Sequence, residues 1–114
     1  ILQRPFMKFW RHFIIHTYDE EIADFRTTFY GTHITEIYQR ECTGLLISEM
    51  GFGEAEDMIR NMNKKALDNR ERIYASNSLF WKNNENKVYH QVKMPLRRKG
   101  NINEVLVCMT FDKA

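Results

Sequence analysis

Three segments of alternating apolar and polar residues follow one another at the carboxyl end of the chain, with only short polar turns between them. They cover residues 73–81, 88–96 and 105–111, and the turns cover residues 82–87 and 97–104. Alternation with period two is typical of a half-buried strand, and consecutive strands joined by short turns pair as an antiparallel meander. Such a sheet is stable where another layer covers its apolar face, so the rest of the chain has to supply that layer.

A regular helical stripe is the best candidate for the covering layer. Residues 54–69 carry apolar side chains at separations of three and four, with charged and amide side chains between them, which predicts an amphipathic helix. A shorter stripe at Ile34, Ile37 and Tyr38 follows Gly31 and predicts a second, short helix. The stripe of the longer helix consists of Ala55, Met58, Ile59, Met62 and Ala66.

The amino-terminal part combines an aromatic stripe with a further strand. Residues 6–15 carry apolar side chains at separations of three and four, which predicts an amphipathic helix. Residues 24–30 alternate instead, with Phe25, Thr27 and Phe29 on one side, and predict a strand. The stripe of the first helix consists of Phe6, Phe9, Trp10, Phe13 and Ile14.

The order of these elements predicts an α+β fold in which the helices gather on one face of an antiparallel sheet. A chain of 114 residues suits a single domain, and we expect residues 1–15 to form a helical segment beside a core of residues 16–114. No stretch of the sequence approaches the roughly 18 to 20 apolar residues of a membrane span, and no signal-peptide pattern is found. We therefore expect a cytoplasmic domain with no membrane partner.

Three short motifs resemble a bacterial subfamily of short PAS domains. Residues 24–26 read D-F-R and are followed, after four residues, by G-T-H-I at 31–34, which is similar to the subfamily run D-F-R-x-x-x-x-G-T-x-I. The pair T-G at 43–44 and the pair P-L at 95–96 are similar to two further subfamily motifs. The chain departs from the pattern at Gln39, where the subfamily commonly has glycine. The resemblance extends over nearly the whole chain.

The resemblance implies a five-stranded antiparallel sheet with short helices and one longer helix on one face. PAS domains are sensory or interaction modules, are often dimeric, and stand alone or beside an output domain such as a kinase or cyclase. The implied function is signal transduction through a small ligand or a partner protein. A ligand-free dimerisation or interaction scaffold is the alternative, and a small enzyme is a third interpretation.

A cavity between sheet and helices is the usual ligand site of this architecture, and two orientations of residues 88–96 compete for it. Periodicity alone turns the more apolar, even-numbered residues inward. The resemblance implies the reverse, with Tyr89, Gln91 and Lys93 facing the cavity. We favour this second orientation because the aromatic stripe at the amino terminus needs the outer face of the sheet to cover. An inward Lys93 then requires a partner, since a buried ammonium is costly.

The same resemblance implies that Leu106, Cys108 and Thr110 face the cavity from the last strand. Polar groups set among aromatic and methionine side chains suit a small organic ligand with a few hydrogen-bonding groups. The candidate ligand-binding residues are Phe29, Met58, Met62, Tyr89, Gln91, Cys108 and Thr110.

The sequence lacks the residues by which PAS domains usually attach flavin or ligate haem. The flavin-binding photoreceptor motif G-R-N-C-R-F-L-Q aligns best with residues 44–51, which puts Ile47 at the reactive cysteine and leaves Cys42 five residues too early. The helix expected over residues 54–69 contains no histidine that could ligate haem. We expect neither cofactor, and the identity of any ligand stays open.

The sequence gives little support for nucleic-acid binding, a metal site or enzyme activity. Seventeen basic and fifteen acidic residues leave a formal charge of +2, too small for the field of a dedicated nucleic-acid binder. The four histidines are scattered without metal-ligand spacing, and no hydrolase or phosphate-binding motif is present. We expect neither a metal site, nor nucleic-acid binding, nor an enzyme.

The aromatic stripe at the amino terminus is the candidate dimer interface, because large exposed apolar patches usually mark interaction surfaces. One alternative is that this segment folds back on its own sheet within one monomer. We favour a homodimer, since a two-fold interface needs just one self-complementary patch. The candidate interface residues are Phe6, Phe9, Trp10 and Phe13.

Overall fold

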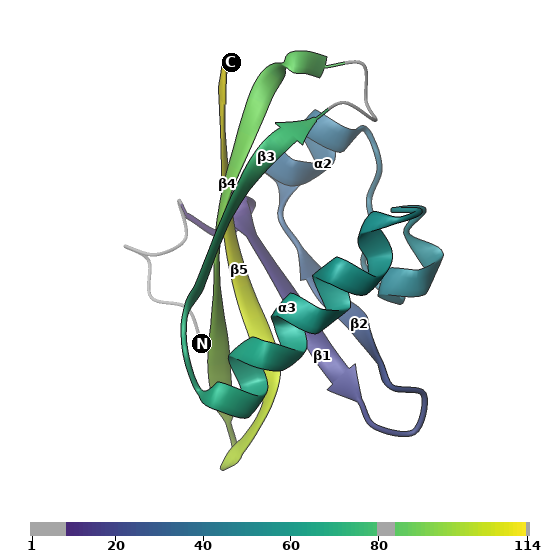
Figure 1. Ribbon diagram of the computed structural model, residues 1–114, viewed down its shortest axis with the longest axis vertical. Coiled ribbons are helices and arrows are strands. Elements are labelled where there is room, and N and C mark those ends of the chain that lie inside the picture. The colour runs from purple at the N-terminus through teal and green to yellow at the C-terminus, as the bar shows by residue number, and fades with distance from the viewer. Residues whose placement is uncertain (1–8, 80–83, 114) are drawn as a thin grey trace.

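The computed structural model describes residues 9–79 and 84–113. Within these residues the chain forms one antiparallel sheet of five strands in the order β2-β1-β5-β4-β3, with the helices gathered on one of its faces (Figure 1). The expected fold class, α+β with a five-stranded antiparallel sheet, is confirmed. The elements in chain order are η1 (Trp10–His12), β1 (Phe13–Asp19), β2 (Asp24–Tyr30), α2 (Thr32–Tyr38), η2 (Ile47–Glu49), α3 (Ala55–Asn69), β3 (Ile73–Leu79), β4 (Asn84–Arg98) and β5 (Asn101–Lys113).

The helix predicted over residues 6–15 is wrong in its second half. Trp10–His12 form a single short turn of 3-10 helix, and Phe13 then begins β1, which pairs with both β2 and β5. Ile14 and Ile15 point to opposite faces of the sheet and both are buried, and a strand buried on both faces reads as a continuous apolar run that periodicity cannot separate from a helix. The run at residues 13–15 is of this kind. Phe6 lies outside the described residues.

A β-bulge decides which side chains of β2 face the helices. His16 pairs with Thr27 and Ile15 with Phe29, so Thr28 is an extra residue with no counterpart on β1. Strict alternation would keep Phe29 on the same face as Thr27. The extra residue reverses the alternation and moves Phe29 to the opposite face of the sheet.

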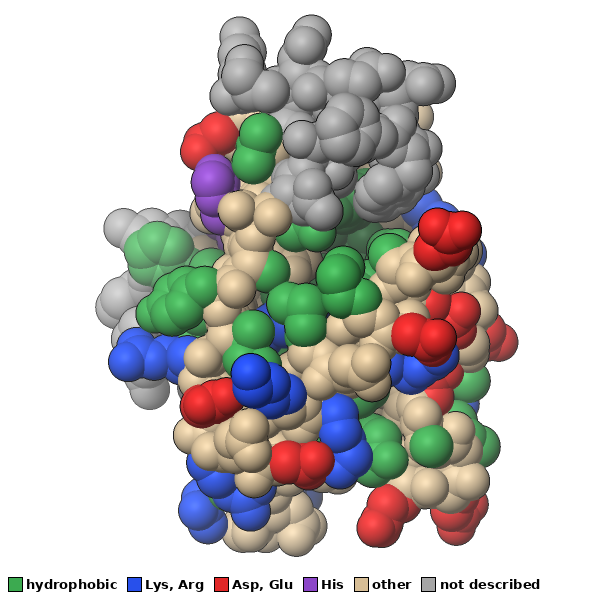
Figure 2. Space-filling view, in the orientation of Figure 1, with side chains coloured by type: hydrophobic (Ala, Val, Ile, Leu, Met, Phe, Trp, Pro, Cys, Tyr) green, Lys and Arg blue, Asp and Glu red, His purple; other side chains and the backbone are tan. Residues whose placement is uncertain are grey.

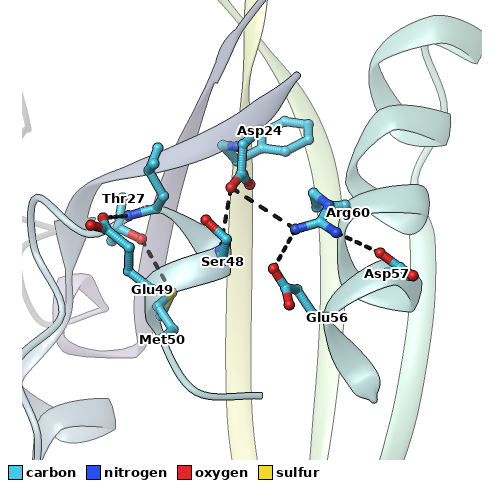
Figure 3. A network of polar contacts seen from close by, with 10 residues as sticks. Asp24, Thr27, Ser48, Glu49, Met50, Glu56, Asp57 and Arg60 are labelled. Atoms are coloured by element: carbon cyan, nitrogen blue, oxygen red, sulfur yellow. Dashed lines mark hydrogen bonds and ion pairs between the residues drawn. The ribbon is translucent and has the colours of Figure 1, made fainter. Parts of the chain in front are cut away.

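The D-F-R motif at the start of β2 fastens the segment between the helices to the sheet. The Asp24 carboxylate accepts a hydrogen bond from the Ser48 backbone N–H at 3.3 Å and lies 3.9 Å from the Arg60 guanidinium (Figure 3). Arg26 donates to the Gly44 carbonyl at 2.8 Å. These contacts link β2 to η2, to the loop before it and to α3.

Gly31 of the second motif is required by close packing. A Cβ at this position would overlap the backbone carbonyl of Arg11, and the Gly31 N–H donates to the Phe13 carbonyl at 2.8 Å. The glycine therefore lets α2 begin directly against the chain that leads into β1.

The longest helix, α3, crosses the inner face of the sheet diagonally (Figure 1). Its carboxyl half buries Asn63, Ala66 and Leu67, whereas Met58 near its amino end is 47% exposed. The helix thus packs tightly against the sheet at one end and leaves space at the other. Among the described residues, no helix is long and apolar enough to cross a membrane.

Candidate ligand cavity

A cavity of about 400 Å³ lies between the amino half of α3 and the inner face of the sheet. Its volume is within the usual range for small-ligand sites. Figure 2 shows hydrophobic side chains gathered around the middle of this face of the molecule. The lining residues are Ile14, His16, Tyr30, Tyr38, Met50, Phe52, Ala55, Met58, Ile59, Met62, Tyr74, Ala75, Ser76, Tyr89, Gln91, Lys93, Val107 and Met109.

The charge of this lining is concentrated in one side chain. Methionine, aliphatic and aromatic residues form most of the wall, and Lys93 is the one described lining residue with a formal charge at neutral pH. None of the lining residues that the structure describes is Asp or Glu. A single cation in a mostly apolar lining is the dominant electrostatic feature of the cavity.

Lys93 reaches the cavity from β4, between Ile73 of β3 and Val107 of β5 in the register of the sheet. Its side chain is 2% exposed, and Nζ donates to Oδ1 of Asn63 on α3 at 2.9 Å. Burial lowers the pKa of Lys93 from 10.5 to about 8, because removing an ammonium from water disfavours its charged form. The side chain is still mostly protonated at pH 7.

His16 lies on the same wall and is held neutral. Its ring is 4% exposed, and Nδ1 is 3.3 Å from the Thr27 hydroxyl. Burial, with a smaller contribution from the positive charge of Lys93, lowers the pKa of His16 to about 3. His16 therefore adds no charge to the cavity at physiological pH, and it neither repels nor neutralises Lys93.

Asn63 is the second polar group beside Lys93. It is fully buried, its Oδ1 accepts from Lys93, and its Nδ2 has no hydrogen-bond partner among the described residues. Asn63 is not among the residues predicted from the sequence, because an amide next to an apolar stripe is typical of the polar side of a helix. Its position four residues after Ile59, on the stripe itself, is the signal that would have found it.

Tyrosine hydroxyls line the remainder of the polar surface. Tyr30, Tyr38 and Tyr89 all line the cavity, and burial raises the pKa of each phenol above its ordinary value. They stay protonated at neutral pH and can each donate or accept a hydrogen bond. Gln91 also lines the cavity, where Nε2 is 3.5 Å from the Met109 sulfur.

The structure places four of the seven sequence-predicted ligand-binding residues on this wall. Met58 and Met62 line the cavity from α3, and Tyr89 and Gln91 line it from β4. The orientation favoured for residues 88–96 is thus the one observed. Whether these side chains bind a ligand stays a prediction.

The other three predicted residues lie on the outer face of the sheet, so their assignment to the cavity is wrong. Phe29 is displaced by the bulge in β2. Cys108 pairs with Phe13 and Val92, and Thr110 follows it on the same face, so the inward orientation carried over for the last strand is wrong. The physical reason is the alternation of β5, because its more apolar set is buried against the helices. That buried set is Val105, Val107 and Met109.

The described part of the aromatic stripe lies against this outer face. The Trp10 ring packs edge-on to Phe29 with centroids 4.6 Å apart and lies 5.9 Å from Phe13. Phe9 is 46% exposed. The three described members of the candidate interface therefore share one side of the molecule, although they do not share a helix.

A crystal structure of a sensory box sensor histidine kinase from Vibrio cholerae has the same arrangement of strands and helices. The two structures superpose with a TM-score of 0.58 over 90% of this chain and 83% of that chain, at 14% sequence identity. The fold is PAS-like. No family model and no curated protein matches the sequence. At this identity the likeness concerns the PAS-like fold alone, so the function has to be argued from the cavity.

Among the described residues, no group of three or more His, Cys, Asp or Glu side chains could hold a metal ion. Cys42 is buried and is not one of the residues that line the cavity. The chemistry available at the PAS-like cavity is hydrogen bonding and charge pairing, centred on Lys93.

Proposed function

We propose that this PAS-like domain is a sensory module that binds a small organic ligand in the cavity and transmits the binding through its sheet to a partner protein or output domain. The observation that carries the proposal is the buried Lys93, which faces a cavity of about 400 Å³ with an amide as its hydrogen-bond partner. Burying an ammonium lowers the stability of the folded protein. A buried ammonium that faces a cavity can bind a ligand there, which is a reason for the protein to retain it.

The sheet provides a short route from the cavity to the outer surface. Successive residues of a strand point to opposite faces, so a shift of Lys93 also moves Val92, which lies opposite Cys108 on the outer face. The outer face carries the aromatic residues Trp10 and Phe29. A partner or a second copy bound there would sense a change in β4 through direct contact.

The alternative, a dimerisation scaffold without a ligand, predicts a core that is filled by side chains. Protein interiors are close-packed, and voids much larger than a water molecule are few. The volume beside Lys93 favours a ligand-binding module over a scaffold.

The test combines detection of a ligand with a variant that fills the cavity. Native mass spectrometry and absorbance of freshly purified protein would reveal a retained molecule, and a thermal-shift screen of small metabolites would reveal an exchangeable one. Met62→Trp adds bulk to the wall and should abolish binding, with overpacking costing about 1–3 kcal/mol of stability. Asn61→Trp, at an exposed position of the same helix, is the matched control and should leave binding intact.

Two results would contradict the proposal. If no retained mass and no stabilising compound is found for folded wild-type protein, the result contradicts the ligand-binding proposal and favours the scaffold interpretation. If a compound binds Met62→Trp and wild type with equal affinity while both are folded, the ligand site is not this cavity.

A further inference from the structure

Lys93, which lines the cavity, and its partner Asn63 on α3 both have N–H groups without a described acceptor. A lysine ammonium has three N–H bonds to donate and a carboxamide has two. Lys93 has one described acceptor, the Asn63 carbonyl oxygen, and Asn63 Nδ2 has no described acceptor. Both side chains are at least nine-tenths buried. Lys93 and Asn63 therefore lack hydrogen-bond acceptors. The ammonium of Lys93 in particular requires a strong acceptor, because it is charged.

Within residues 9–79 and 84–113, the elements packed around Lys93 place no carboxylate beside it. The adjacent positions on β3 and β5 are Ile73 and Val107, and β1 contributes the neutral His16. Within the described part of the chain the buried carboxylates are Asp24 and Glu104.

Both of these carboxylates have partners of their own. Asp24 accepts from the Phe25 and Ser48 backbone N–H groups and faces Arg60. Glu104 pairs with Arg98 at 2.9 Å and accepts from Thr17. The cation of Lys93 is therefore uncompensated, in contrast to these two buried anions.

We infer that the ligand of this cavity is a small monocarboxylate whose acid group pairs with Lys93 and whose apolar body lies against the methionine and aromatic wall. This inference rests on the proposed function and adds the chemical class of the ligand. A carboxylate provides the acceptor oxygens that the ammonium lacks, and charge-assisted hydrogen bonds are the stronger ones. One cation in the lining matches one carboxylate, and a second anionic group would be buried without a partner.

The experiment compares acids with their uncharged amides, which have nearly the same shape. Phenylacetate and hexanoate are titrated into wild-type protein at pH 7 by calorimetry, beside phenylacetamide and hexanamide. Because each acid gains a charge-assisted contact that its amide lacks, we expect the acid to bind about tenfold tighter or more. Butyrate and octanoate pairs extend the comparison to smaller and larger bodies.

Lys93→Met retains the length of the side chain and removes the charge, so it should abolish the preference for acid over amide. Lys93→Gln serves the same purpose if the methionine variant does not fold, as judged by circular dichroism. Lys65→Met removes an exposed lysine of α3 and should leave the preference unchanged. Raising the pH through the Lys93 pKa should weaken binding of the acids and leave binding of the amides constant.

The outcomes separate this inference from the proposed function. Equal affinity of acids and amides in wild type, or an acid preference that persists in Lys93→Met, overturns the monocarboxylate assignment while the cavity remains a ligand site. The monocarboxylate assignment is also overturned if no acid binds while another compound binds wild type and loses affinity in Met62→Trp. Failure of all compounds, including the broad screen, overturns the proposed function itself.

Discussion

The buried ammonium of Lys93 makes the stability of the ligand-free protein depend on pH in a direction opposite to that of a lysine paired with a carboxylate. Its folded pKa of about 8 lies below the unfolded value of 10.5. Between these values the unfolded chain binds a proton that the folded chain has released, so stability rises with pH. Below pH 8 both states are protonated, and the folded state carries the full cost of burying the charge.

The size of the effect follows from the same two values. Their separation corresponds to a penalty of about 3 kcal/mol on the folded protein at neutral pH. Raising the pH from 7 to 10 relieves about 2–3 kcal/mol of that penalty, because some unfolded chains are still protonated at pH 10. Other groups titrate over this range too, so the measurement needs a reference protein without the lysine.

Lys93→Met is that reference. Urea unfolding of wild type and Lys93→Met, followed by circular dichroism at pH 7, 8, 9 and 10, gives the difference in unfolding free energy at each pH. We expect wild type to gain about 2–3 kcal/mol relative to the variant over this range. The variant also leaves Asn63 Oδ1 without its donor, at a cost of about 1–3 kcal/mol, but an amide does not titrate and this cost is constant.

A difference between the two proteins that stays flat from pH 7 to pH 10 would refute the reasoning, since Lys93 would then titrate alike in both states. A difference that falls with pH would show that the lysine has an anionic partner in the ligand-free fold. The exposed-site variant Lys65→Met should run parallel to wild type throughout.

Two further predictions concern the outer face and the motif at β2. Trp10→Glu should convert a homodimer into a folded monomer in sedimentation velocity, because a carboxylate would be buried unpaired in the interface; wild type that stays monomeric at high micromolar concentration removes the dimer proposal. Asp24→Ala should lower the unfolding free energy by about 1–3 kcal/mol, since the Ser48 N–H loses its acceptor and Arg60 a counter-charge. Asp68→Ala removes an exposed ion pair with Lys64 and should cost less than about 1 kcal/mol, so an equal loss in both variants would show that the buried position of Asp24 is unimportant.

Local pattern was sufficient for the elements whose residues meet the core on one face. The stripe at residues 54–69 corresponds to α3, the alternation at residues 24–30 and 88–96 lies in β2 and β4, and the described part of the segment 73–81 forms β3. These segments have one apolar side and one polar side, and the period of that contrast differs between helix and strand. The orientation of Lys93 needed more than period, because the more apolar residues of β4 face outward. It was predicted from the resemblance together with the need of the aromatic stripe for a surface.

The remaining features depend on contacts between distant residues. Phe13 begins a central strand because β2 and β5 pair with it on either side, and its own neighbourhood fits a helix equally well. The bulge at Thr28 turns Phe29 outward, and the register of β5 turns Cys108 outward, although a shift of one residue in either strand would reverse the result. The sequence by itself determined the fold class and most of the elements, since these follow from local periodicity. Only the tertiary structure brought Lys93 and Asn63 into contact beside an apolar cavity whose described lining has no carboxylate, because the two residues are thirty apart in the sequence and their contact depends on how α3 crosses the sheet.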